Sequence, residues 1–164
     1  MGIITSGMRV AAVAIGASSM AILTCTAHAQ TAPTTLLNVY EQPASAFCQG
    51  MPGCRVDFTT VQQNLKVLRV SCLIDVQTTA ITALIGDFQL GNASSDQVIY
   101  SFGEYLAPLQ LLSASGTNQI YIANVETLHV VPAGSRPAVL IVTRLNPPAT
   151  MAAQCSISGT FTSN

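Results

Sequence analysis

The chain has 164 residues, of which 49% are hydrophobic and only 8% are charged. Six Lys and Arg stand against seven Asp and Glu, which gives a net charge of −1 at pH 7. This balance excludes a basic surface for nucleic acid, and the sequence contains no polybasic segment that would hold the chain on an anionic membrane.

Residues 1–29 have the parts of a secretory signal peptide. Arg9 is the only charge ahead of a run of small and apolar residues from Val10 to Ala27. Ala27-His28-Ala29 then forms a small-x-small cleavage site, with Gln30 as the first residue after it. The sequence therefore predicts a secreted or periplasmic protein.

Two alternatives to cleavage stay open. The apolar run is about long enough to span a bilayer as an anchor, but it is rich in Ala, Ser and Gly rather than Leu and Ile. A lipoprotein signal ending at Cys25 is the second alternative. If the signal is removed, residues 30–164 remain, which is the length of one ordinary domain. We expect no membrane span in that mature chain.

The cysteines of the mature chain indicate disulfides. An even number in an exported chain predicts two bonds. We favour Cys48–Cys54, because the five residues between them, QGMPG, include three turn formers that let the segment fold back. The four mature cysteines are Cys48, Cys54, Cys72 and Cys155.

We expect the second bond to be Cys72–Cys155. Each of these cysteines shares strand parity with apolar neighbours, so both should face the core, where a bond between two sheets can form. Cys54 shares parity with Val56 and Phe58, so Cys54–Cys72 and Cys54–Cys155 remain as alternatives. The cysteine spacing fits neither a structural zinc site nor a C-x-x-C redox motif.

In chain order, the mature sequence alternates apolar strands with turns. The long segment LKVLRVSCLIDV changes parity between Val67 and Leu68, which predicts a β-bulge there. Residues 106–112 contain Pro108, which argues against a central strand and favours a short helical turn. Pro132-Ala133-Gly134-Ser135 predicts a turn within a hairpin. The expected strands are 36–40, 55–61, 65–76, 80–90 (strand or helix), 97–103, 119–131, 136–145 and 155–162, and the expected loops include 91–96 and 146–154.

Eight or nine short strands, turn signals about every ten residues and no convincing helix predict an all-β fold. We expect an antiparallel β-sandwich of a jelly-roll-like kind, with a small β-barrel as the alternative.

The sequence points to no catalytic, metal or cofactor site. His129 is the only histidine in the mature chain. A Ser-His-Asp catalytic triad needs a histidine beside a nucleophile and a carboxylate, but no nucleophile-elbow motif is present. Copper sites of the cupredoxin type need two histidines. The seven acids are scattered, so no carboxylate pair for glycoside hydrolysis can be identified. We therefore expect a protein that is not an enzyme.

Two functions remain. The first is a structural or protein-interaction protein of the envelope, which joins itself or another envelope protein through an edge strand, since few charges guard its strands. The alternative is a module that binds a glycan or another small ligand. Tyr105, in the segment FGEYLAP, is then the best exposed aromatic candidate, with Glu104 beside it.

Overall fold

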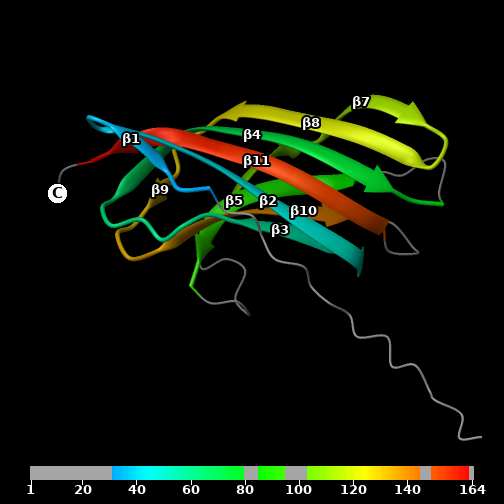
Figure 1. Ribbon diagram of the computed structural model, residues 1–164, viewed down its shortest axis with the longest axis horizontal. Helices are drawn as coiled ribbons and strands as arrows, with labels where there is room; N and C mark the ends of the chain where they lie inside the picture. The colour runs from blue at the N-terminus through cyan, green and yellow to red at the C-terminus, as the bar shows by residue number, and fades with distance from the viewer. Residues whose placement is uncertain (1–30, 80–84, 95–102, 145–148, 163–164) are drawn as a thin grey trace, which may run out of the picture.

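The computed structural model describes residues 31–79, 85–94, 103–144 and 149–162 (Figure 1). Within these ranges the protein is an antiparallel β-sandwich of two sheets, without a helix, and it is not closed into a barrel. The predicted fold class is confirmed, and the strand count is higher because the elements include two short strands. The predicted signal peptide and nearly all of the expected strand 97–103 lie outside the described residues.

Sheet A is the larger layer. Its strand order is β1-β2-β11-β4-β8-β7, and the short strand β9 also pairs with β4. The central pair, β11 and β4, is antiparallel along almost its whole length. The strands of sheet A are β1 (Thr34–Leu36), β2 (Val39–Met51), β4 (Leu65–Gln77), β7 (Gln110–Ser115), β8 (Asn118–Glu126), β9 (Val130–Val131) and β11 (Ala149–Phe161).

Sheet B has the strand order β3-β10-β5-β6 and covers the inner face of sheet A. Its strands are β3 (Gly53–Asp57), β5 (Ile85–Ala93), β6 (Gly103–Pro108) and β10 (Arg136–Thr143). The core between the layers is apolar, since alternate residues of each strand face inward. On β4 the predicted inward set is buried as expected, and it comprises Leu65, Val67, Val70, Cys72, Ile74 and Val76.

The predicted β-bulge is confirmed at Leu68. Arg69 pairs with Ser158 and Val67 pairs with Gly159, so Leu68 is the extra residue that has no partner on β11. The backbones approach closely here, because a Cβ on Gly159 would lie 2.2 Å from the carbonyl oxygen of Lys66. Only glycine fits at this position without a backbone shift.

The expected first strand, 36–40, is wrong in its bounds. The chain turns at Leu37-Asn38, so that β1 and β2 form a hairpin in which Leu36 pairs with Val39. Pro43 lies inside β2 and does not end it. The last pair between β1 and β2 is Thr34 with Glu41, so no described strand pairs with β2 on that side at Pro43, where a residue without an N–H is tolerated.

The expectations for residues 106–112 and 132–135 are also corrected. No helical turn forms at Pro108, because this residue ends β6 at the edge of sheet B, and β7 then starts at Gln110 in sheet A. The turn at 132–135 does not close a hairpin. The strands on its two sides, β9 and β10, belong to different sheets, so the turn carries the chain across the sandwich.

Two expected loops belong partly to strands. Gly91–Ala93 continue β5, and β11 begins at Ala149, inside the expected loop 146–154. Pairing with a neighbouring strand decides both cases: Ala93 lies opposite Arg136 of β10, and Ala153 lies opposite Ile74 of β4.

Candidate functional site

The two disulfides connect different parts of the sandwich. Cys48 near the end of β2 is bonded to Cys54 in β3, with a Cα–Cα distance of 5.5 Å. Because β2 belongs to sheet A and β3 to sheet B, this bond joins the two layers where the chain crosses between them. The pairing is the one favoured from the sequence.

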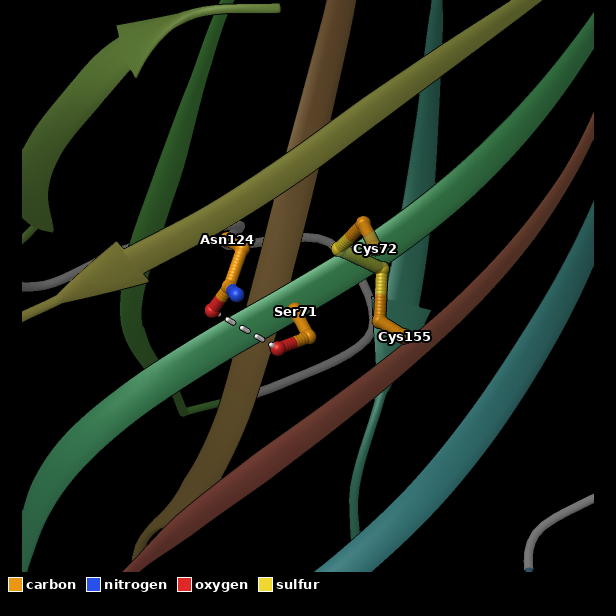
Figure 2. The surroundings of a disulfide bond; sticks show 4 residues. All are labelled: Ser71, Cys72, Asn124 and Cys155. Carbon is orange, nitrogen blue, oxygen red and sulfur yellow. Dashed lines mark hydrogen bonds between the residues drawn. A yellow bond between two sulfur atoms is a disulfide. The ribbon is translucent and has the colours of Figure 1, made fainter.

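Cys72 and Cys155 form the second disulfide, again as favoured (Figure 2). The expectation that it joins two sheets is wrong, because Cys72 in β4 and Cys155 in β11 are opposite residues of neighbouring strands in sheet A. Both are buried on the core face. Parity predicted the face, but it carries no information on which strands are neighbours. Residues directly opposite one another on adjacent strands have neighbouring Cβ atoms, so two cysteines at such positions can bond through their Sγ atoms.

The edges of sheet B carry features that discourage strand addition. Arg55 in β3 forms an ion pair with Asp57, with Nε and Oδ1 2.8 Å apart. Strand β6 contains Glu104 and ends at Pro108. Charges and proline at an edge oppose pairing with another chain.

Strand β7, at one edge of sheet A, lacks such features. Its sequence is QLLSAS, without a charge or a proline, and all six residues are exposed. Among the described residues, β7 pairs only with β8. Leu111 and Leu112 have exposed fractions of 55% and 60%. A bulge between Leu111 and Ser113 leaves Leu112 outside the ladder with β8.

Strand β1, at the opposite edge of sheet A, is also uncharged but has only three residues. Pro33 precedes it and limits its extension. Beyond Glu41 no described strand pairs with β2 on the side of β1, and this open stretch, Gln42–Met51, is uncharged but contains Pro43. Thus β7 is an edge strand with neither a charge nor a proline along its length, and Figure 1 shows it at the end of the molecule away from β1.

A polar cluster connects the two sheets beside the segment between β8 and β9. His129 Nε2 lies 3.3 Å from Asn92 Oδ1, and His129 Nδ1 lies 3.9 Å from Glu104 Oε2. The Thr127 hydroxyl donates a hydrogen bond to the same Glu104 oxygen and accepts one from the His129 backbone N–H at 3.2 Å. Asn92 and Glu104 belong to sheet B, while Thr127 and His129 lie between β8 and β9 of sheet A.

Burial lowers the pKa of His129, and the nearby Glu104 carboxylate offsets this only in part. Its side chain is only 13% exposed, so the neutral imidazole is favoured in the folded protein. The sequence predicts a strand over 119–131 that includes His129, but in the structure His129 lies in the connection between β8 and β9. The sequence could not show that Asn92 and Glu104 meet this histidine from the other sheet, because all three are far apart in the chain.

An open hollow lies beside Glu104. Arg69 and Glu126 approach to 3.6 Å within it, but both side chains are well exposed, so the ion pair contributes little. The residues that line the hollow are Leu68, Arg69, Glu104, Glu126, Thr127, Leu128 and Ser158.

The structure does not bring Tyr105 and Glu104 together. Glu104 lies opposite the buried Leu90 and takes part in the inter-sheet cluster, whereas Tyr105 lies opposite Gln89 and is 54% exposed. Adjacent residues of a strand point to opposite faces, so Tyr105 does not line the hollow beside Glu104. A binding role for either residue remains a prediction.

Within the described ranges, no three His, Cys, Asp or Glu side chains gather closely enough to hold a metal ion. The same residues contain no helix that is long and apolar enough to cross a membrane.

No protein family profile matches the chain, and no curated protein matches it. Among solved structures, a chain from the Cyanophage Pam1 capsid asymmetric unit is 13% identical, with a TM-score of 0.39. The alignment covers 80% of this chain and 92% of the capsid chain. A likeness at this level carries no functional argument, so the function is argued from the geometry of the chain itself.

Proposed function

We propose that the protein acts outside the cytoplasm as a structural or protein-interaction protein, and that β7 is the strand that joins its partner. Two disulfides favour an oxidising compartment, since such bonds are rare in cytosolic proteins. The proposed role is binding and includes no catalytic step.

The open edge of β7 is the observation that carries this proposal. An added strand forms main-chain hydrogen bonds with an edge strand, and side chains of the edge supply specificity. On β7 the exposed apolar side chains are Leu111 and Leu112, and no charge repels an incoming strand. The edges of sheet B contain charges and end at Pro108, and the opposite edge of sheet A consists of the short β1 and the open part of β2, which contains Pro43.

Site-specific photo-crosslinking in the cells that make the protein tests the proposal. A benzophenone amino acid replaces Leu112 in one variant and Leu128 in the other. Leu128 is the matched control, because it is a leucine of similar exposure, 70% against 60%, that lies outside the strands. We expect position 112 to give a covalent adduct with a protein identified by mass spectrometry, and position 128 to give none.

The result also has a clear negative form. If irradiation gives no adduct at position 112, or gives the same adducts at both positions, β7 is not a binding edge and the proposed function is wrong. The identity of the captured protein is a separate question.

A further inference from the structure

We infer that the outer face of sheet A, the face turned away from sheet B, binds the same face of a second copy of this chain. The two copies are related by a two-fold axis that lies between them and runs across the strands, over the row that contains Ser156 and Ser71. This face is separate from the edge of β7 and is not part of the proposed function. In Figure 1 sheet A lies in front of sheet B, with its outer face toward the viewer.

Two charged side chains on this face have no partner within their own chain. Lys66 and Asp75 lie in β4 between residues that face the core, so their side chains point outward. Within the described ranges neither forms an ion pair or a side-chain hydrogen bond, and Oδ1 of Asp75 is shielded from solvent without a donor. The other charged side chains of these ranges, apart from Glu41, lie near an opposite charge or, for Glu104, near His129. A partner that supplies one anion and one cation would pair both residues.

The strand register places these two charges symmetrically about the middle of the face. Lys66 pairs with Thr160 of β11, four residues after Ser156. Asp75 pairs with Ala152 of β11, four residues before Ser156. The two charges therefore lie about 13 Å from the row of Ser156, in opposite directions. A two-fold axis over that row places Lys66 of each copy against Asp75 of the other, so the dimer contains two such ion pairs.

The exposed apolar side chains of the face follow the same symmetry. The row of the lysine also contains Val39 on β2 and Val130 on β9. The row of the aspartate contains Phe47 on β2 and Ile120 on β8. Val39, Val130 and Phe47 are each about half exposed. The axis brings Val39 to Phe47 and Val130 to Ile120 of the other copy, and removing these side chains from water favours the dimer.

The middle of the face is polar and slightly hollow. Ser71 donates a hydrogen bond to Asn124 Oδ1 at 3.2 Å (Figure 2). We expect the two copies to touch at the two ends of the face and to keep water in the centre, because ordered water satisfies hydroxyl and amide groups across such a gap. The residues that line the hollow include Pro43, Ser45, Ser71, Gln154 and Ser156.

The symmetry of the face favours a second copy over a different protein. A different partner needs a matching surface of its own, whereas this face contains both the cation and the anion at equal distances from one axis. Because both copies use the same face, the contact closes at a dimer and leaves no second face for a third molecule. Facing sheets align within about 30°. That angle displaces the ends of the face by roughly one strand spacing, which the flexible four-carbon stem of Lys66 spans.

Sedimentation velocity of the purified protein over a wide range of concentration tests this dimer. We expect a dimer that dissociates on dilution. Lys66→Glu and Asp75→Lys should each weaken it by at least about tenfold in dissociation constant, because each substitution puts like charges together at both ends of the face.

The double variant Lys66→Glu, Asp75→Lys is the decisive measurement. It exchanges the two charges, so opposite charges again meet between copies, and the dissociation constant should return to near that of the wild-type protein. The two positions lie about 26 Å apart on one strand, so a direct contact within one chain cannot explain such a rescue.

Arg144→Glu is the matched control. It changes the net charge as much as Lys66→Glu does, at a side chain that is 73% exposed and lies outside sheet A, and it should leave the dimer unchanged. Circular dichroism and urea unfolding of each variant establish that a loss of dimer is not a loss of fold. Two single variants are used so that one remains as the test if the other does not fold.

A protein that is monomeric at all concentrations overturns the inference. So does a dimer that neither single variant weakens, a dimer that Arg144→Glu weakens equally, or a double variant that stays monomeric. The proposed function is tested separately, since a monomeric protein that still captures a partner through position 112 loses only this dimer.

Discussion

The Cys48–Cys54 disulfide ties sheet A to sheet B, whereas Cys72–Cys155 ties two neighbouring strands inside sheet A. The first bond spans a sequence separation of 6 residues and the second a separation of 83. Each bond can act on the native state, by holding packed elements together, or on the unfolded chain, by reducing its entropy. The bond that joins the two sheets closes the shorter loop, so the two effects predict opposite rankings of the two disulfides. Removing each disulfide therefore tests which effect is larger.

Loss of the long-range disulfide should have the largest effect. On the chain-entropy account, closing a loop of this length stabilises the fold by about 4.5 kcal/mol. Strands β4 and β11 remain hydrogen-bonded along their length without it, so the change acts mainly on the unfolded chain. We expect the double variant Cys72→Ala, Cys155→Ala to lose about 4.5 kcal/mol in free energy of unfolding, measured by urea denaturation.

Loss of the short-range disulfide should cost less. A loop of six residues gives about 2 kcal/mol on the same account, although this bond is the one that joins the layers. We expect Cys48→Ala, Cys54→Ala to lose about 2 kcal/mol in the same urea experiment. If this variant is the less stable of the two, the tie between the sheets outweighs loop length, and the entropic ranking is wrong for this protein.

The polar cluster around His129 connects the two sheets through a titratable group instead of a covalent bond. The pKa of His129 is lowered by burial in the folded protein, so the unfolded chain binds its proton more readily. The contribution of neutral His129 to the stability of the fold is fully present above the unfolded-state pKa of about 6.5. This contribution is lost as the pH falls toward and through the lower pKa of the folded state. We expect the free energy of unfolding to fall as the pH drops below about 7.

His129→Gln is the control for this pH dependence. Glutamine keeps a side-chain amide that can bond to Asn92 but does not titrate. The variant should therefore show a flatter pH profile of its urea midpoint than the wild-type protein. Equal slopes for the two proteins would show that His129 does not account for the acid sensitivity.

Local features of the fold could be predicted from the sequence, whereas the pairing of distant strands could not. Alternation along LKVLRVSCLIDV was enough to predict the buried face of β4 and the bulge at Leu68, because both depend on residues that are local in the chain. Alternation could not show that Cys72 and Cys155 lie on adjacent strands. It also could not separate β9 from β10 into different sheets, since a turn signal looks the same in a hairpin and in a crossing.

The candidate site was predictable only in outline. A low-charge β-protein with a poorly guarded edge follows from composition. The particular edge was not predicted, because Pro108 made residues 106–112 look unlike a strand. In the structure Pro108 ends β6, an edge strand of sheet B. Strand β7, an edge strand of sheet A, begins two residues later at Gln110. The cluster of His129, Asn92 and Glu104 depends on three distant segments, which no local pattern connects.

A substitution in the turn of the β1–β2 hairpin should have the smallest effect on stability, because it changes the strain of one backbone conformation and breaks no covalent bond. Leu37 has a φ of 57° at the turn and is 94% exposed. A left-handed conformation costs a residue with a Cβ roughly 1–2 kcal/mol, whereas glycine adopts it freely at an entropic cost of about 0.5–1 kcal/mol. We expect Leu37→Gly to raise the free energy of unfolding by about 0.5–1 kcal/mol. Leu36→Gly, at an exposed strand residue without a positive φ, should instead lower it, and a loss of stability in both variants would mean that the side chain of Leu37 is held by contacts worth more than its strain.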